Sequence, residues 1–304
     1  MTKYFFHLID RIKPSGRSVV IAVPFGFMLL FLMAPFLAVI KISFADLRMA
    51  IPPYSPLTSW VDGVLQIKLD FSHYGSVLSD SLYLGAYVKS VEVAVLTTFV
   101  CLLIGYPTAY LIARSNPTRR NLLMIGVMLP FWTSYLIRIY AWIGILKERG
   151  LLNSLLIWSH IIDQPLRIYH TNWGLYIGMV YSYLPYLILP LYAHLVKLDF
   201  KLLEAARDLG AKPWKVFVTV TLPLSRRGVV AGCLLVFIPA VGEYVIPALL
   251  GGADSLMIGG VMWDDFFNNA DWPVAASAAC AMVALLLIPM AWFQRTKMME
   301  LDGK

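Results

Sequence analysis

The stretch Leu203-Glu204-Ala205-Ala206-Arg207-Asp208-Leu209-Gly210 lies in a hydrophilic loop between two long apolar segments. Apolar residues in and just before it recur at i, i+3, i+4 and i+7, which makes one helical face of Leu202, Ala205, Ala206 and Leu209. Asp199 suits the N-cap of this helix and Gly210 its C-terminal stop. Because so short a helix is marginal alone in water, we expect its small apolar face to dock on a partner at the cytoplasmic side.

The composition is that of a membrane protein. Hydrophobic residues make up 59% of the chain, charged residues make up 14%, and the mean hydropathy is +0.71. Repeated apolar runs of about twenty residues predict an all-α, polytopic membrane protein rather than a soluble globular one. The net charge of +7 is spread over short loops, so membrane lipid is an expected partner and nucleic acid is not.

Motifs for catalysis and metal binding are missing from the sequence. It has no G-x-x-x-x-G-K-[ST] P-loop and no G-x-S-x-G nucleophile motif, so ATP hydrolysis would have to come from a partner. The three cysteines lie in apolar segments without C-x-x-C spacing, and the five histidines form no H-E-x-x-H. We therefore expect no metal, no cofactor and no enzymatic activity.

Hydropathy predicts six transmembrane helices at residues 18–44, 88–113, 122–146, 173–196, 228–250 and 274–293. The segments between and around them include an N-terminal segment (1–17), an outer loop (45–87), an inner loop (197–227) and a tail (294–304). Alternation of polar and apolar residues at 65–69 predicts a short strand in the outer loop, and the apolar piece 151–162 is expected at the membrane interface. With the N-terminus inside, the inner segments hold seventeen Lys and Arg and the outer loops five. The positive-inside rule therefore places both termini and the 197–227 loop in the cytoplasm.

The spacing of Glu204-Ala205-Ala206, Gly210 and Leu222-Pro223 resembles the EAA loop of ABC-importer permeases. The plain alternative is that these residues are simply good helix formers, but their place between two spans favours the resemblance. In that family the loop forms a coupling helix that docks into a groove of the ATPase subunit. The resemblance implies coupling roles for Glu204, Ala205, Ala206, Asp208, Leu209 and Gly210.

Further segments are similar to the bacterial spermidine/putrescine importer permeases, closest to the first of the two permeases of such systems. They are LPFWTSYLIR (129–138), PAVGEYVIP (239–247), LLGG (249–252) and DWP (271–273), and the similarity runs from about residue 24 to 292. It implies the type I ABC importer permease fold and a subunit that moves polyamines, putrescine and/or spermidine, across the bacterial inner membrane by alternating access. The partners that it implies are a second homologous permease, two copies of an ABC ATPase and a periplasmic polyamine-binding protein.

Other functions stay open at this point. The chain could serve an importer of the same type for a metal cation, an opine or an anion, or a receptor that uses the Glu204 loop only for docking. A membrane enzyme is disfavoured, because the spans lack clustered His and Cys and paired carboxylates. The outer segments hold ten acidic and five basic residues, which favours a cationic substrate, although the positive-inside rule already depletes basic residues there.

Two ionisable residues, Arg138 and Glu243, fall inside apolar segments, where charged groups are costly and are usually functional or paired. Their depths in the predicted spans are similar, so they could form an intramembrane pair. Alternatively, Glu243 faces the substrate pathway and meets an ammonium group together with aromatic side chains. The aromatic candidates for that pathway are Tyr244, Tyr183, Trp132 and Tyr135.

Overall fold

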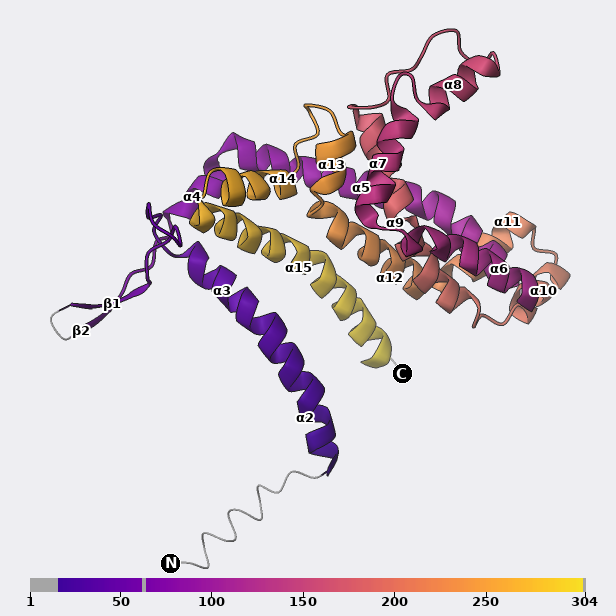
Figure 1. Ribbon diagram of the computed structural model, residues 1–304. Coiled ribbons are helices and arrows are strands. Elements are labelled where there is room, and N and C mark those ends of the chain that lie inside the picture. The colour runs from indigo at the N-terminus through magenta and orange to yellow at the C-terminus, as the bar shows by residue number, and fades with distance from the viewer. Residues whose placement is uncertain (1–15, 62–63, 303–304) are drawn as a thin grey trace, which may run out of the picture.

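The computed structural model describes residues 16–61 and 64–302, so most of the expected N-terminal segment (1–17) and the last two residues of the tail lie outside the described part. The described elements are almost all helical (Figure 1). In chain order they are α2 (Gly16–Met28), η1 (Leu29–Met33), α3 (Ala34–Ser43), β1 (Thr58–Val61), β2 (Val64–Ile67), α4 (Ser72–Ser79), α5 (Ser81–Arg114), α6 (Pro117–Met128), η2 (Leu129–Trp132), α7 (Tyr135–Leu146), α8 (Leu151–Trp158), α9 (Asn172–Leu195), α10 (Lys201–Asp208), α11 (Pro213–Val216), η3 (Phe217–Thr221), α12 (Leu222–Val241), α13 (Val245–Leu250), α14 (Ile258–Trp263), η4 (Asp264–Asn268) and α15 (Trp272–Asp302).

Helices α5, α9 and α12 pack against one another and form the centre of the molecule (Figure 1). Leu187 of α9 is fully buried between two glycines of the other helices. A Cβ at Gly232 of α12 would lie 3.0 Å from the Leu187 carbonyl oxygen, and one at Gly105 of α5 would lie 2.6 Å from the Leu187 Cδ2 atom. Small residues therefore let the three backbones approach closely, as is common between membrane helices.

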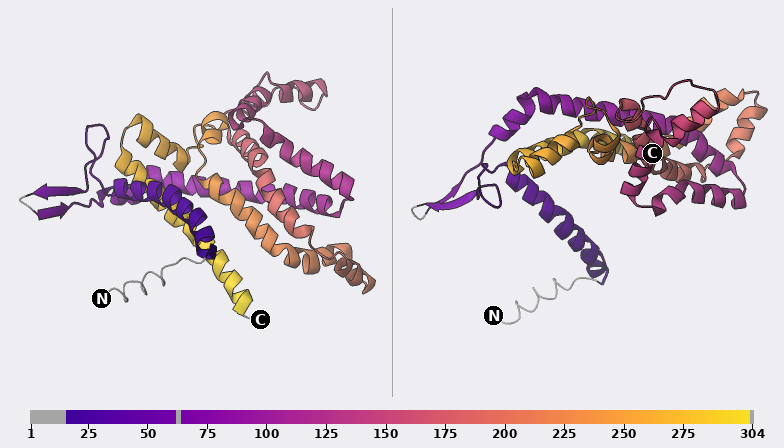
Figure 2. Two further views of the ribbon diagram at one scale, coloured as in Figure 1. Left: turned by 60° about the horizontal axis from the view of Figure 1, so that its bottom comes forward. Right: turned by 45° about the horizontal axis from the view of Figure 1, so that its top comes forward.

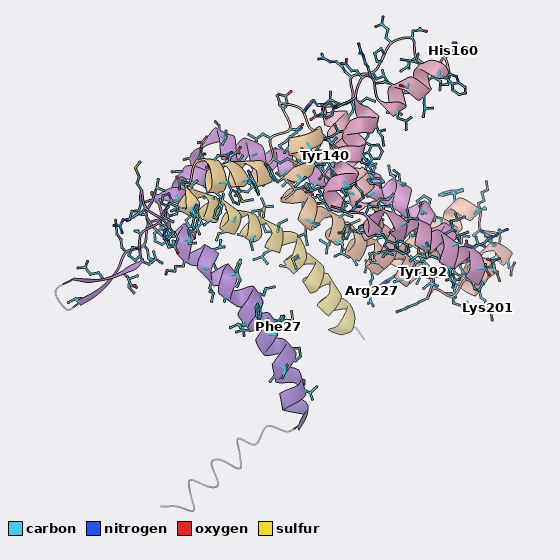
Figure 3. The ribbon with its side chains drawn as sticks, in the orientation of Figure 1. Phe27, Tyr140, His160, Tyr192, Lys201 and Arg227 are labelled. Atoms are coloured by element: carbon cyan, nitrogen blue, oxygen red, sulfur yellow. The ribbon has the colours of Figure 1, made fainter. Side chains whose placement is uncertain are left out.

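The N-terminal helix stands apart from this centre. Residues Val20–Ser43 form one helical rod of 24 residues, which includes most of the expected first span. No residue of its apolar stretch is buried. In the right view of Figure 2 the rod points away from the bundle, and Figure 3 shows Phe27 on its outer part. Its α3 part packs against the rest of the chain, along α15. The exposed rod therefore has an apolar surface that lipid or a partner subunit must cover.

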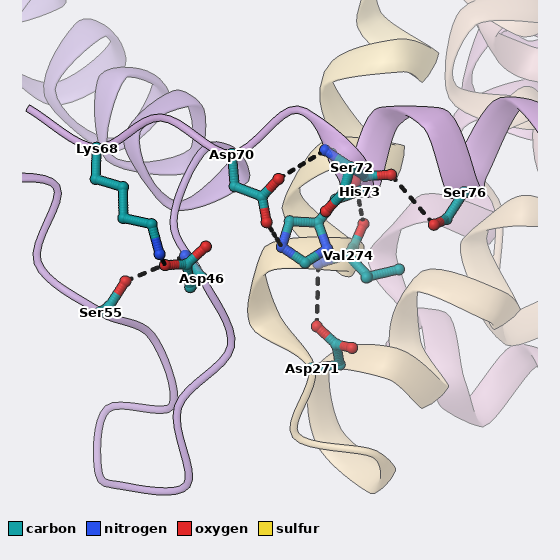
Figure 4. A network of polar contacts seen from close by, with 10 residues as sticks. Asp46, Ser55, Lys68, Asp70, Ser72, His73, Ser76, Asp271 and Val274 are labelled. Carbon is teal, nitrogen blue, oxygen red and sulfur yellow. Dashed lines mark hydrogen bonds and ion pairs between the residues drawn. The ribbon is translucent and has the colours of Figure 1, made fainter.

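The expected outer loop 45–87 has more structure than one strand. β1 and β2 form an antiparallel hairpin, and α4 and the first turns of α5 follow. Figure 4 shows the polar contacts that fix the loop: Lys68 pairs with Asp46, whose backbone N–H donates to Ser55 Oγ at 3.1 Å. Asp70 Oδ1 accepts the backbone N–H of Ser72 at 2.8 Å, and this hydrogen bond lowers the pKa of the Asp70 carboxyl.

The expected third span, 122–146, is not a continuous helix. Pro117–Trp132 and Tyr135–Trp158 meet at an angle of 93°. Thr133 and Ser134 leave the helical region, with ψ angles of 153° and 139°. The chain therefore turns sharply inside an apolar segment, where hydropathy alone predicts an uninterrupted span.

The expected fifth span, 228–250, is also broken. Its helix begins earlier, as part of the run Pro213–Val241, and a new helix starts at Val245. In an unbroken helix the ring of Pro247 would clash with the carbonyl of Glu243, four residues earlier. The break therefore places Glu243 between α12 and α13 rather than inside a helix.

By length and hydropathy alone, the described helices do not show all six expected membrane spans. Four of them are long and apolar enough to cross a membrane, and the bent pair around residues 133–134 makes a possible fifth. The apolar part of α15, Trp272–Ile288, is shorter, although the helix continues to Asp302. Six spans therefore stay a prediction.

The close approach at Gly232 gives a test of the packing. We expect Gly232→Val to lower the melting temperature of the purified protein in detergent, because the added side chain meets a backbone atom of α9 and overpacking costs about 1–3 kcal/mol. Gly85→Val on α5 is the control, since a Cβ there meets nothing within 4 Å. Equal melting temperatures for the two variants would contradict this packing.

Candidate functional site

The predicted helix exists as α10, and Gly210 ends it as the sequence indicates. The N-cap residue is Phe200 rather than the expected Asp199, whose Oδ1 accepts the backbone N–H of Lys201 at 3.0 Å from one residue earlier. At the other end Gly210 has a φ of +83°. Its N–H donates to the Arg207 carbonyl at 2.8 Å, and the Ala211 N–H donates to the Ala206 carbonyl at 3.1 Å. These two bonds form a Schellman turn, which needs a left-handed residue at the position of Gly210.

One side of α10 is buried and the other presents apolar side chains to the exterior. Leu203 is 4% exposed and anchors the helix, whereas Leu202 is 50% and Leu209 89% exposed. Trp214 of α11 adds an indole that is 67% exposed. Figure 3 places Lys201, the first residue of α10, at the far end of the bundle. An apolar face on a short polar loop is typical of a protein contact.

Aromatic contacts tie α10 to the bundle on its N-terminal side. The ring of Phe200, just before α10, lies edge-on to Tyr110 of α5, with centroids 6.4 Å apart. The Arg114 guanidinium lies 5.6 Å from the Tyr110 centroid and 5.8 Å from the Phe200 centroid. These contacts join the start of α10 to the end of α5.

A second contact follows the loop on its C-terminal side. Phe217 of η3 lies edge-on to Tyr106 of α5, with centroids 5.3 Å apart. The Tyr106 and Ser225 hydroxyls are 2.8 Å apart and both are buried, which joins α5 to the first turn of α12. The loop that carries α10 is thus fixed at both ends to helices of the central bundle.

Glu243 is the centre of a second cluster, at the break between α12 and α13. Its Oε1 accepts the backbone N–H groups of Tyr244 at 3.1 Å and Val245 at 2.9 Å, so it caps the start of α13. Its Oε2 accepts the hydroxyls of Tyr135 at 3.0 Å and Tyr183 at 2.6 Å. The carboxylate therefore joins α7, α9 and α13 and has a donor for each of its roughly four lone-pair positions.

The direct pair between Arg138 and Glu243, one of the two alternatives for these residues, is not among the ion pairs of the described residues. The Arg138 guanidinium instead lies 5.1 Å from the Phe131 ring centroid and 5.7 Å from that of Tyr135. Because the Tyr135 hydroxyl donates to Glu243, the tyrosine stands between the positive and the negative charge. Phe131 precedes the break at 133–134 and Arg138 follows it, so the same contact also spans that break.

The side chains of the remaining predicted pathway residues, Trp132 and Tyr244, lie outside this cluster. Trp132, on η2, is 76% exposed, and the ring of Tyr244 stacks on Trp263 of α14, with centroids 4.7 Å apart and planes at 14°. The sequence named Glu243, Tyr135 and Tyr183 among five candidates for a pathway, and the structure brings these three side chains together. The sequence gave no sign of Trp263. In the described residues there is no group of three His, Cys, Asp or Glu that could hold a metal.

A buried carboxylate, that of Asp265, was missed by sequence reasoning. Asp265 was expected only as one of the acids of an outer loop, but it is 8% exposed and accepts the Tyr83 hydroxyl at 2.6 Å. Asn269 Nδ2 donates to its other oxygen at 3.1 Å. The contact fixes η4 on α5, next to the small core of Val77, Tyr87, Ile258 and Ala278. Nothing in the sequence separates Asp265 from its acidic neighbours.

Comparison with known proteins decides the family. Residues 102–296 match the family described as binding-protein-dependent transport system inner membrane components. The chain belongs to this family. A binding-protein-dependent permease is an inner-membrane, multi-pass transport subunit, and both α10 and the Glu243 cluster fall inside the matched segment.

Curated relatives of this permease match over nearly its whole length. It is 36% identical over 290 residues to the "Spermidine/putrescine transport system permease protein PotB" of Haemophilus influenzae, covering 95% of this chain and 97% of the relative. The Escherichia coli protein of the same name is 36% identical over 276 residues, covering 90% and 96%. A chain of a bacterial alginate ABC transporter crystal structure has the same fold, with a TM-score of 0.72 at 14% identity over 94% of this chain and 95% of that one.

The hydroxyl of Tyr183 gives a test of the Glu243 cluster in this permease. We expect Tyr183→Phe to destabilise the purified protein by about 1.5–3 kcal/mol, because a hydrogen bond to a charged group is lost and the partly buried carboxylate is left with one donor fewer. Tyr181→Phe is the matched control on the same helix. Its ring packs edge-on against Trp142 at 5.2 Å, and no hydrogen bond of its hydroxyl is recorded among the described residues. If the melting temperature in detergent falls equally for both variants, the Glu243 carboxylate does not hold α7, α9 and α13 together as described.

Proposed function

We propose that this chain is the permease subunit of an ATP-driven importer that moves polyamines, spermidine and/or putrescine, across the inner membrane. The observation that carries the proposal is the similarity to spermidine/putrescine permeases at 36–38% identity over 89–95% of the chain. A similarity of that length includes the segments 129–138 and 239–247, which hold Tyr135 and Glu243. The permease itself performs no covalent chemistry in this proposal, and ATP hydrolysis belongs to a partner.

The proposed assembly contains a second, homologous permease, two copies of an ABC ATPase and a periplasmic polyamine-binding protein. The exposed apolar surface of the rod Val20–Ser43 is evidence for a partner within the membrane. The exposed Leu202 and Leu209 are evidence for a partner that contacts α10 at the membrane surface. We place both termini and α10 in the cytoplasm, because Lys and Arg are concentrated in the segments on that side. The four long apolar helices, the bent α6–α7 pair counted as one span and α15 counted as another then give six membrane spans.

Alternating access requires motion at α10 to reach the middle of the bundle. The Phe200–Arg114 and Phe217–Tyr106 contacts join the α10 loop to α5, and the Tyr106–Ser225 hydrogen bond joins α5 to α12. Helix α12 runs 20 residues, about 30 Å at 1.5 Å per residue, and ends next to Glu243. We propose that ATPase movement is transmitted along this route to the two helix breaks.

The substrate pathway is proposed to follow the breaks at 133–134 and 242–244, because non-helical backbone at membrane depth is tolerated where it lines a cavity or is buried in protein. In this proposal Glu243, Tyr135 and Tyr183 hold the wall in shape, and Tyr244 and the exposed Trp132 add aromatic rings beside it. Coupling is proposed for Glu204, Ala205, Ala206, Asp208, Leu209 and Gly210.

Reconstitution tests the function. The four-component complex in proteoliposomes, supplied with loaded binding protein, is expected to take up labelled spermidine or putrescine only when ATP is present. A metal cation, an opine and an inorganic anion serve as competing solutes in the same vesicles. ATP-dependent uptake of one of these, with none of either polyamine, would contradict the proposed substrate.

Gly210 tests the coupling helix separately. Valine is disfavoured at a φ of +83° and would distort the Schellman turn after α10, so Gly210→Val is expected to lower uptake about tenfold or more while the membrane level of the protein stays near normal. Gly126→Val on α6 is the control, because a Cβ there meets nothing within 4 Å and its φ is not left-handed. A Gly210→Val complex that assembles fully and transports at the wild-type rate would refute the coupling role.

A further inference from the structure

A pocket of about 400 Å³ lies between α13, the loop that follows it and α14. It is at the N-terminal end of α9, where the position of Gly174 Cβ would be 2.9 Å from the Leu250 carbonyl oxygen. The docking helix α10 follows the opposite end of α9, which has 24 residues and is therefore about 36 Å long. The pocket thus lies on the side of the molecule away from the proposed ATPase, where a substrate enters.

The floor of the pocket is held in one shape by hydrogen bonds. Ser255, which is 3% exposed, accepts the backbone N–H of Gly252 at 3.1 Å and donates to Asn172 Oδ1 at 3.0 Å. The Gly251 N–H donates to the Pro247 carbonyl at 3.0 Å. These contacts tie the loop to the first residue of α9, so the cavity is a formed feature of the fold.

Two side chains that line the pocket, those of Asp264 and His170, offer hydrogen-bond acceptors. Asp264 accepts from Asn268 Nδ2 at 2.7 Å through Oδ1, which leaves its Oδ2 for a ligand. The Nδ1 atom of His170 lies 3.1 Å from the Gly251 carbonyl oxygen. A carbonyl only accepts, so Nδ1 carries the proton and Nε2 of the neutral ring is left as an acceptor.

The charge of the pocket selects the ligand class. Its lining residues, all in the described part of the chain, include the carboxylate of Asp264 and the aromatic side chain of Tyr244 but no lysine or arginine. A carboxylate, a ring nitrogen acceptor and an aromatic side chain together suit a cation with several N–H donors. An anion would find no positive partner there.

Glu243 is a weaker candidate for the same ligand. Its two oxygens already accept four donors from within the chain, so an ammonium group could bond to it only by displacing one of them. The Arg138 guanidinium, 5.7 Å from the Tyr135 ring, adds a positive charge beside the cluster. The Asp264 carboxylate has no comparable set of donors.

We propose that the pocket between α13 and α14 binds an ammonium group of the transported polyamine, with Asp264 as the anionic ligand and His170 and Tyr244 beside it. This inference rests on the proposed function, since it names the place where that substrate is first held by the permease. Glu243 acts in the pathway wall below this pocket, where it joins α7, α9 and α13 at the helix breaks.

Direct binding tests the proposal. The purified complex, without binding protein, is dialysed against labelled spermidine, and its dissociation constant is measured. We expect saturable binding that Asp264→Asn weakens about tenfold or more, because a charge-assisted hydrogen bond is lost, and that Asp264→Glu largely restores. Ala248→Trp is expected to weaken binding as well, since Ala248 lines the pocket and the indole fills it without removing any acceptor.

The control is Asp254→Asn, which removes an exposed carboxylate from the same loop that does not line the pocket. All variants are compared as intact complexes recovered by size-exclusion chromatography. The proposal is overturned if Asp264→Asn or Ala248→Trp binds like wild type, if Asp254→Asn weakens binding as much, or if the wild-type complex shows no saturable binding. ATP-dependent spermidine uptake by the wild-type complex is measured in parallel, so that failure of the pocket with normal uptake leaves the proposed function standing.

Discussion

Backbone groups at a helix break need hydrogen-bond partners wherever water is absent, and this constraint shapes the middle of the molecule. The break after α12 frees the first N–H groups of α13, and the Glu243 carboxylate accepts two of them. The same carboxylate brings a charge into an apolar region, and the hydroxyls of Tyr135 and Tyr183 stabilise it. One side chain therefore satisfies the break, and its own requirements fix where α7 and α9 must lie.

The relation of Arg138 to Glu243 follows from the same constraint. A direct ion pair would occupy carboxylate positions that the two tyrosines and the α13 N–H groups fill. The guanidinium lies instead over the rings of Phe131 and Tyr135, and the Tyr135 hydroxyl completes the connection. Opposite charges are thus kept near each other across two helix breaks through an aromatic ring, which is a directional arrangement that a change in the angle between α7 and α13 would disturb.

Sequence patterns predicted the parts of this structure that depend on local chemistry. The helix at 201–208, its Gly210 stop and its exposed leucines follow from spacing and backbone preference, and hydropathy located α3, α5, α9 and α12. The breaks at 133–134 and 242–244 could not be predicted in the same way. Hydropathy measures the apolar character of side chains and not the backbone conformation, and membrane helices tolerate many prolines without breaking. The partners of Glu243 and the burial of Asp265 depend on segments that are 60 and 182 residues away, and one sequence contains no information on which of many tyrosines meets which acid.

Carboxylates along a polyamine pathway act under opposing demands, because a multivalent cation must be attracted and then released. A bare carboxylate 4 Å from one ammonium group contributes about 4 kcal/mol at an effective dielectric constant of 20, and several such contacts would hold the substrate too tightly to pass. At Glu243 the charge is already shared among four donors and lies near Arg138, so the field that a passing cation meets is reduced. Asp264, at the exposed rim of its pocket, keeps an oxygen for a ligand and is screened by water. The Asp264 pocket would attract the proposed substrate at the entrance, and the Glu243 carboxylate would attract it more weakly at the helix breaks. The substrate could then move inward without being bound too tightly on the way.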